Sequence, residues 1–400
     1  MVRGDNRYMD KERMDMKSNH KDSNISSSDP RSINIPNFFY VGYGVINDLE
    51  RILNKEGIKI DGSLIVSGNG YTAEIADSIA SRINYARRLC ISSNDIDAIK
   101  SIEKVVEDNN INIAVAVGGG KVIDTVKYAC SKLNKPVLVI PTTLSNDGIS
   151  SPVSVVRMFR ESVSVKPPIG IVVDIGIVKK APKHTILAGI GDLISNLSAV
   201  EDWRLAHEYT GLQIDRFAEI VSRNAAERFI YYVLKNGRKG FECNEDNSSN
   251  DLNYNYNYNG NSRSSILNDN KFLICLAEGL IQSGIAMSIA GSSRPASGAE
   301  HLISHALDTI LDKPKPHGIQ VGFATLFTQV LRGSDITDIM EVYRLVGFPT
   351  TLDAMGISVN EFIEAIRIAP YTRKNRFTIL NIVDESSIRN ALRLAYGIGS

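Results

Sequence analysis

Three of the six histidines in the chain fall within one short segment, and histidine suits both metal binding and proton transfer near neutral pH. His301 and His305 are four residues apart, so a helix would place both imidazoles on one face. His317 follows the sequence KPKP, a turn that ends the helix and would bring a third imidazole back towards it. The spacing alone leaves two interpretations open, a metal site and three unrelated histidines, since such pairs also arise by chance.

The composition limits the class of protein. The chain has 400 residues, 43% hydrophobic and 22% charged, which is typical of a soluble globular protein with room for two domains. Lys and Arg number 45, as do Asp and Glu, so the balance indicates no nucleic-acid partner. No run resembles a signal peptide or a transmembrane helix, and we expect a cytoplasmic protein without membrane insertion. The cysteines are far apart, which favours reduced thiols over a disulfide framework: Cys90, Cys130, Cys243 and Cys275.

The order of strand and helix patterns divides the chain into regions. Residues 1–32 predict a disordered extension, and residues 244–270, rich in Asn and Tyr, predict a flexible surface insertion. Residues 33–180 alternate strands with amphipathic helices, which predicts a Rossmann-like α/β domain with a parallel, doubly wound sheet. Residues 181–400 predict an all-α domain. The strands are expected at 63–68, 87–92, 111–120, 135–143 and 170–178.

A glycine run follows the third of these strands. Gly118, Gly119 and Gly120 carry no side chains, so backbone N–H groups and the N-terminus of the next helix could approach a pyrophosphate. The run does not match G-x-G-x-x-G, and a tight turn without a ligand is the alternative.

The fourth strand ends in PTTLSNDGISSP (141–152), at the edge of a parallel sheet where ligands bind. Its hydroxyl groups could contact phosphate or ribose, and Asp147 is its only carboxylate. The alternative is that these residues only form turns and helix caps.

Four segments together resemble one family. GGGKVIDTVK, PTTLSNDGISSP, GIGDLISNLSAVEDWRLA and SRPASGAEHLISHALD with the later HG are similar to sn-glycerol-1-phosphate dehydrogenases. That family belongs to a superfamily of metal-dependent polyol dehydrogenases and dehydroquinate synthase. The resemblance covers roughly residues 36–400 apart from the Asn/Tyr insertion, and it implies the dehydroquinate synthase-like fold.

The resemblance implies a role for each matching residue. Asp192 would bind both metal and substrate, His301 and His317 would be the other zinc ligands, and Asp147 and His305 would contact the substrate. The expected catalytic residues are therefore Asp147, Asp192 and His305. The residues expected to bind NAD(P) are Gly118, Gly119, Gly120, Lys121, Val122, Thr142, Thr143, Leu144, Ser145 and Ser151.

Two positions near these residues leave questions open. Asn146 stands where the family usually has His, and an amide cannot titrate, which puts a proton-relay role at this position in doubt. Arg294 is a candidate contact for a substrate phosphate, although an arginine at a surface or helix end is as good an interpretation. Residues 91–95, at the end of the second strand, leave the choice between NAD and NADP open.

The resemblance further implies an activity. With one Zn²⁺ per subunit and NAD(P)H, the enzyme would reduce dihydroxyacetone phosphate reversibly to sn-glycerol 1-phosphate, the backbone of archaeal-type membrane lipids. A homo-oligomer with no partner beyond its small-molecule substrate is expected. The alternatives are a glycerol dehydrogenase acting on unphosphorylated glycerol, a lyase like dehydroquinate synthase, and an inactive binding protein that keeps the fold.

Overall fold

Parallel strands and helices alternate through the first half of the described chain. The computed structural model describes residues 31–156, 162–237, 266–373 and 375–397. Within them six strands form one parallel sheet in the order β1-β8-β5-β4-β2-β3. The strands are β1 (Phe38–Gly42), β2 (Leu64–Ser67), β3 (Arg87–Cys90), β4 (Ala114–Gly118), β5 (Val137–Pro141) and β8 (Gly170–Asp174). The predicted α/β arrangement with a parallel sheet is confirmed.

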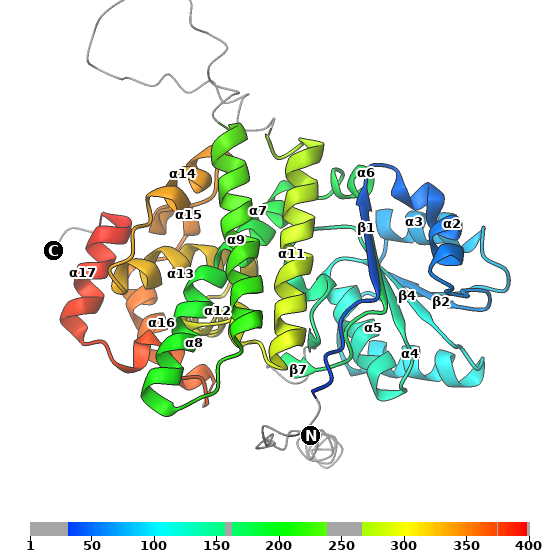
Figure 1. Ribbon diagram of the computed structural model, residues 1–400, viewed down its shortest axis with the longest axis horizontal. Coiled ribbons are helices and arrows are strands. Elements are labelled where there is room, and N and C mark those ends of the chain that lie inside the picture. Colours follow the sequence, from blue (N-terminus) through cyan, green and yellow to red (C-terminus); the bar gives the residue numbers. More distant parts are fainter. Residues whose placement is uncertain (1–30, 157–161, 238–265, 374, 398–400) are drawn as a thin grey trace, which may run out of the picture. The chain divides into compact units, whose positions relative to one another are not determined.

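Helices cover both faces of the sheet. Figure 1 shows α2 (Leu49–Lys55) and α3 (Tyr71–Ala80) on one side, and α4 (Ile96–Asp108) and α5 (Gly120–Lys132) on the other. Strands β2, β4, β5 and β8 are buried along their whole length, because side chains on both faces lie under helices. This explains why the sequence reads as unbroken apolar runs rather than as alternating polar and apolar positions.

The last predicted strand, 170–178, was too long. It ends at Asp174, and residues Ile175–Val178 form the short helix α6. The Asp174 carboxylate caps that helix by accepting from Gly176 N at 2.7 Å and from Ile177 N at 3.3 Å. Three strands were not predicted at all: β1 and the antiparallel pair β6 (Val153–Val155) and β7 (Ser162–Ser164).

Helices make up the described chain after β8, as predicted. A short 3-10 turn, η5 (Arg294–Ala296), precedes α12, and η6 (Ile379–Asn381) precedes α17. The helices are α7 (Lys183–Ile194), α8 (Asn196–Thr210), α9 (Arg216–Gly237), α11 (Asn270–Ala290), α12 (Ala299–Ile310), α13 (His317–Leu331), α14 (Thr337–Val346), α15 (Leu352–Met355), α16 (Val359–Thr372) and α17 (Glu385–Tyr396).

One of these helices, α11, is long and apolar enough to cross a membrane by length and composition alone. In the structure, 72% of its most apolar window is buried inside the protein, as in the core helix of a globular fold. Figure 1 shows α11 between the sheet and the other helices.

Two segments predicted from composition fall largely outside the described residues. These are the extension at 1–32 and most of the insertion at 244–270. The last residue of that predicted insertion, Asn270, is the first residue of α11.

Helices α7 and α13 touch through their backbones, and this contact positions the site. A side chain at Gly191 on α7 would overlap the carbonyl oxygen of Gly318 on α13, and one at Gly318 would overlap the carbonyl of Ala188. Only glycine permits so close an approach. The contact sets Asp192, next to Gly191, opposite His317, next to Gly318.

Candidate functional site

Three helices bring the predicted metal ligands together. Asp192 lies on α7, His301 lies on α12, and His317 is the first residue of α13. One carboxylate oxygen and one nitrogen of each imidazole all lie within 4.8 Å of one another. His301 Nε2 is 3.9 Å from Asp192 Oδ1, and the two imidazole rings meet edge to face with centroids 5.0 Å apart. A donor set of two imidazoles and one carboxylate suits a divalent transition metal.

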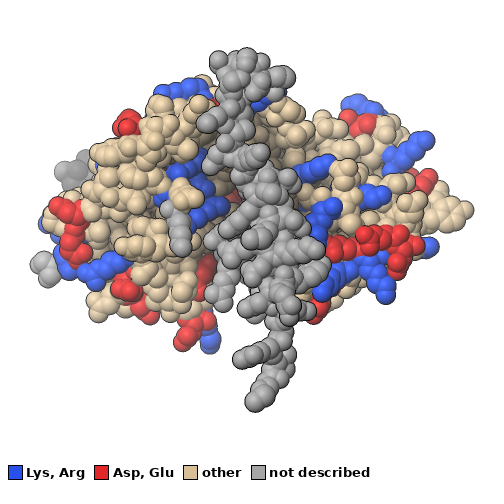
Figure 2. All heavy atoms as spheres, turned by 90° about the horizontal axis from the view of Figure 1, so that it is seen from below, with Lys and Arg blue, Asp and Glu red and all other residues tan. Residues whose placement is uncertain are grey.

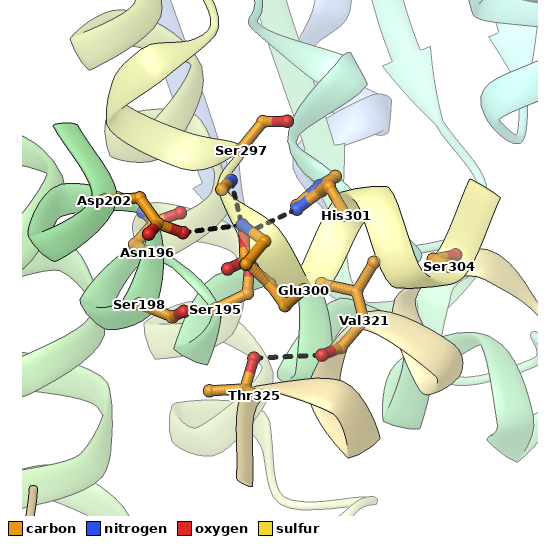
Figure 3. A network of polar contacts seen from close by, with 12 residues as sticks. Ser195, Asn196, Ser198, Asp202, Ser297, Glu300, His301, Ser304, Val321 and Thr325 are labelled. Carbon is orange, nitrogen blue, oxygen red and sulfur yellow. Dashed lines mark hydrogen bonds and ion pairs between the residues drawn. The ribbon is translucent and has the colours of Figure 1, made fainter. Parts of the chain in front are cut away.

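A buried carboxylate holds the imidazole of His301 from its far side. Glu300 Oε1 accepts a hydrogen bond from Gly298 N at 2.6 Å and lies 3.0 Å from His301 Nδ1. Because this oxygen acts as an acceptor, His301 donates from Nδ1 and keeps the Nε2 lone pair free for a ligand role. Figure 3 shows Glu300 between Asp202 and His301.

Asp202, on α8, fixes the loop that leads into α12. Its Oδ2 accepts from Ala299 N at 2.6 Å, and its Oδ1 accepts from Ile379 N at 2.7 Å. It also forms an ion pair with Arg332. This buried carboxylate therefore joins α8, α12 and the segment before α17 behind the histidines.

The other two histidines lie against each other. Ser304 Oγ is 2.9 Å from His317 Nδ1, which leaves Nε2 of that ring available. The ring of His305 stacks on that of His317 with centroids 5.7 Å apart. Burial lowers the pKa of His301 to about 3 and that of His305 to about 4, and it lowers the pKa of His317 as well. All three imidazoles are therefore neutral near pH 7, the form that binds a metal.

A second set of donors lies next to the first. His305, Asp308 and His317 also place one ligand atom each within 4.8 Å of one another. Asp308 is exposed, and its Oδ1 already accepts from Gln320 Nε2 at 2.7 Å. Asp192 is buried instead, so it has more to gain from a cation. The set of Asp192, His301 and His317 is the better site.

The loop after β5 reaches the same place. Asp147 N donates to Asp192 Oδ2 at 2.9 Å, and Asp147 Oδ2 accepts from Ser283 Oγ on α11 at 2.9 Å. Burial raises the pKa of Asp147 to about 6. Burial and, next, the charge of Asp147 raise the pKa of Asp192. The buried carboxylate of Asp192 and the half-buried carboxylate of Asp147 repel each other, and a cation bound between the helices would relieve that repulsion.

A buried lysine holds this loop in shape. Lys127 Nζ, on α5, donates to the carbonyl oxygens of Gly148 at 2.8 Å, Ser151 at 3.0 Å and Val153 at 2.6 Å. Its charge faces Asp124 Oδ1 at 3.6 Å. Lys127 lies in the interior, with 1% of its surface exposed.

The glycine run forms the turn from β4 into α5. No side chain caps the first turn of α5, whose N-cap is Gly119, so the N–H groups at this end can meet an anion. A Cβ at Gly118 would lie 2.8 Å from Val122 Cβ, and one at Gly119 would lie 3.2 Å from Thr143 Oγ1. The turn is thus packed between its own helix and the loop after β5.

Of the remaining residues expected to bind NAD(P), Lys121 and Val122 lie on α5, and the other five lie along that loop. Thr142 N donates to Gly118 O at 3.0 Å, which ties the loop to the glycine turn. Thr142, Leu144 and Ser151 are buried, whereas Lys121 is exposed. Ser151 Oγ has no hydrogen-bond partner among the described residues. The remaining residues of the predicted set, Thr143 and Ser145, are half-buried.

The side chains of Asn146 and Arg294 form hydrogen bonds with the backbone. Asn146 Oδ1 accepts from Gly148 N at 3.0 Å and so caps the 3-10 turn η2 (Asp147–Ile149). Arg294 donates to the carbonyl oxygens of Phe377 at 2.8 Å and Asn375 at 3.1 Å. Sequence reasoning missed Glu300 and Ser304, although both stand beside the histidines in AEHLISH, and a search for acceptors next to each histidine would have found them.

Comparison with known proteins agrees with this arrangement. Residues 40–182 match the family model of iron-containing alcohol dehydrogenase. The chain resembles a probable glycerol dehydrogenase from Sinorhizobium meliloti, with a TM-score of 0.67, 21% identity, and coverage of 92% of this chain and 98% of that one. Glycerol dehydrogenase from Schizosaccharomyces pombe gives a TM-score of 0.68 at 19% identity, over 92% of this chain and 91% of the other. These likenesses confirm the predicted fold class.

Fold and relatives together define an NAD(P)-dependent dehydrogenase. Glycerol-1-phosphate dehydrogenase [NAD(P)+] from Pyrococcus horikoshii is 34% identical over 351 residues, which cover 86% of this chain and 92% of that protein. The protein of the same name from Saccharolobus islandicus (strain L.S.2.15 / Lassen #1) is 35% identical over 87% of this chain and 92% of its own length. The chain belongs to the glycerol-1-phosphate dehydrogenase family, as its motifs had indicated.

Proposed function

We propose that this enzyme reduces dihydroxyacetone phosphate to sn-glycerol 1-phosphate with NAD(P)H, in a reversible reaction. One observation supports this function most directly. Asp192, His301 and His317 lie together beside the loop after β5, and that loop is hydrogen-bonded to the glycine turn. The names of the relatives supply the substrate.

The residues at the centre fit a catalytic metal. Three protein donors leave room for a substrate oxygen at a fourth position, as a catalytic site requires. Glu300 and Ser304 hold the Nδ1 atoms of the two imidazoles, which leaves each Nε2 for the ion. When bound, the nicotinamide supplies the hydride and the divalent ion polarises the ketone oxygen of the substrate.

The protein's own groups would bind the cofactor, orient the substrate and transfer the proton. Gly118 to Val122 would hold the cofactor pyrophosphate, and Thr142 to Ser145 with Ser151 would line the cofactor. Asp147, half-buried and held by Ser283, would orient a substrate hydroxyl. His305, partly exposed beside the metal ligands, is neutral near pH 7, so it or a water molecule would relay a proton to the alkoxide oxygen; the imidazole would donate from one ring nitrogen while the other accepts a proton from solvent.

Finer assignments belong to the same proposal. We take the ion to be zinc, one per subunit, although this donor set also accepts Fe²⁺ or Ni²⁺. Residues 33–180 would form the cofactor domain and 181–400 the metal and substrate domain. We further propose a cytoplasmic homo-oligomer that supplies the glycerophosphate backbone of archaeal-type lipids.

The test is an assay of the metal-loaded enzyme with NADH and with NADPH. Dihydroxyacetone phosphate and dihydroxyacetone are compared as substrates, and the chirality of the glycerol phosphate formed is determined. We expect a strong preference for the phosphorylated ketone and the sn-1 product. Equal kcat/KM values on the two ketones would favour a glycerol dehydrogenase instead.

A further inference from the structure

Three arginines gather at the end of the site that lies towards the chain's last helices. They come from two segments, the turn around η5 and the residues after α16. Arg376 Nη1 donates to Ser297 O at 2.8 Å, and its Nη2 donates to Ser293 Oγ at 2.7 Å. Arg373 donates to the same Ser293 Oγ at 3.3 Å. Arg294 donates to the carbonyl oxygens of residues 375 and 377, so it holds in place the loop segment that carries Arg376.

Two of these arginines, Arg294 and Arg376, lie near carboxylates that are bound by other groups. Arg376 is only 9% exposed. In the part of the chain that the structure describes, neither Arg294 nor Arg376 forms an ion pair with a carboxylate. The nearby acids have other partners, since Asp202 pairs with Arg332 and Glu300 accepts from Gly298 N and His301. A buried guanidinium without a counter-charge is unfavourable and calls for an anion.

Donors remain available for such an anion. A guanidinium has five N–H groups, and Arg376 uses its two Nη atoms for one contact each. Ser293 Oγ accepts from two arginines, so its own hydrogen is free to point elsewhere. Burial lowers the pKa of Arg376, the charges of Arg373 and Arg294 lower it further, and the charges of Glu300 and Asp202 oppose this only in part. A bound dianion would reverse that unfavourable field.

The group lies next to the proposed reaction centre. Ser297, whose carbonyl oxygen Arg376 binds, stands four residues before His301, across the N-cap of α12. Arg376 therefore holds the chain immediately before α12, the helix that carries both His301 and His305. In dihydroxyacetone phosphate, the phosphorus is three bonds from the ketone carbon. A ketone held at the histidines would therefore carry its phosphate within a short reach of these arginines.

We propose that Arg373, Arg376 and Ser293 bind the phosphate of the substrate, and that Arg294 positions them. The subsite rests on the proposed function and takes a phosphate monoester of a small ketone or alcohol. Arg373 also donates to Ser162 Oγ on β7, at 2.7 Å, so it links the subsite to the segment that follows the cofactor loop. The face seen from below shows a group of basic side chains among mostly uncharged residues on its helical half (Figure 2), a surface that would attract an anionic substrate.

The experiment compares Arg373→Gln, Arg376→Lys and Ser293→Ala with wild type in the metal-loaded enzyme. The control is Arg367→Gln, an exposed arginine on α16 that pairs with Glu385. Each variant is assayed with dihydroxyacetone phosphate and with dihydroxyacetone, and inorganic phosphate is tested as a competitive inhibitor. Thermal unfolding and metal content show whether each variant is folded. Arg373 is the less buried arginine, so its variant keeps the test sound if Arg376→Lys fails to fold.

We expect each arginine variant to lose roughly 10- to 100-fold in kcat/KM for dihydroxyacetone phosphate, the range of a hydrogen bond to a charged group. Turnover of dihydroxyacetone should stay at the wild-type value, and inhibition by phosphate should weaken. Equal losses on both ketones, or no loss on either, would overturn the subsite. A changed preference between NADH and NADPH would place the arginines at the cofactor and also overturn it. If wild type itself shows no preference for the phosphorylated ketone, the proposed function fails first.

Discussion

Glu300 and His301 are neighbours in the chain, and the Oε1 of the first lies 3.0 Å from the Nδ1 of the second. Adjacent residues on a helix normally point apart. Here Glu300 is fully buried at the first turn of α12 and also accepts from Gly298 N, so its side chain folds back over the helix start. The carboxylate therefore accepts from the N–H of the N-cap residue Gly298 and fixes which nitrogen of the His301 imidazole stays free for a ligand role.

Replacing Glu300 with Gln should weaken the metal site while leaving all three ligands in place. Loss of the carboxylate charge should lower metal affinity roughly 10- to 100-fold, as for other residues that orient a ligand. Competition with a fluorescent chelator measures the affinity. The exposed Glu208→Gln is a matched control. Unchanged affinity in Glu300→Gln would show that His301 needs no such partner.

The division of roles among the histidines can be tested by metal analysis. His301→Ala and His317→Ala should lose the bound ion, and with it several kcal/mol of transition-state stabilisation, on the order of 1,000-fold in kcat/KM. His305→Ala should keep the ion but lose roughly 100- to 10,000-fold in kcat. His184→Ala, at an exposed position, serves as the control. Loss of metal from the His305 variant would instead favour the ligand set with Asp308.

Lys127→Met should loosen the loop that carries Asp147. The change leaves three buried carbonyl groups without their donor and Asp124 without its counter-charge. We expect a loss of roughly 3 kcal/mol in the free energy of unfolding. Urea unfolding measures it, with the exposed Lys104→Met as control. A loss below about 0.5 kcal/mol, the usual range for surface positions, would contradict the structural role.

The three described cysteines should differ sharply in reactivity. Cys90 is exposed at the end of β3, where its Sγ lies 2.8 Å from Asn69 Oδ1. Burial raises the pKa of Cys130 to about 12 and that of Cys275 to about 11, so almost no thiolate forms there at pH 8. Maleimide should label Cys90 alone among them, as measured by peptide mass spectrometry.

The same labelling also tests the cofactor site. Cys90 lies at the same sheet edge as the glycine turn, because Ser67 on β2 is in register with both Cys90 and Val117. NAD(P)H bound across that edge should slow the labelling of Cys90. Labelling at an unchanged rate with saturating cofactor would place the cofactor elsewhere.

Local patterns in the sequence predicted much of the fold but less of the site. Apolar runs that end in glycine or a polar loop predicted the buried strands, because a strand covered by helices on both faces consists almost entirely of apolar residues. The end of β8 was missed because Ile175–Val178 are as apolar as the strand. The side chain of Asp174 caps these residues, so they begin a helix instead of continuing the strand. The spacing of His301 and His305 suggested that both bind metal, and only the resemblance separated their roles.

Long-range contacts explain what the sequence could not predict. Arg376 and Ser293 are 83 residues apart, and nothing in either segment marks them as neighbours. Arg294 looked like a phosphate contact because it stands in the SRPASG loop, yet its guanidinium binds the chain at 375–377. The proposed phosphate subsite therefore uses Arg373 and Arg376, two arginines that the sequence did not single out.

The backbone contact between Gly191 and Gly318 has one more consequence. It fixes the spacing of the neighbouring residues Asp192 and His317 through main-chain atoms, so two ligands are set by rigid helices before any ion arrives. The conformational entropy of these two side chains is lost when the protein folds. An ion that binds between them therefore does not have to order them, which favours its binding. If the proposed subsite is correct, substitutions in the arginine segment after α16 would change the choice of substrate without moving these two side chains.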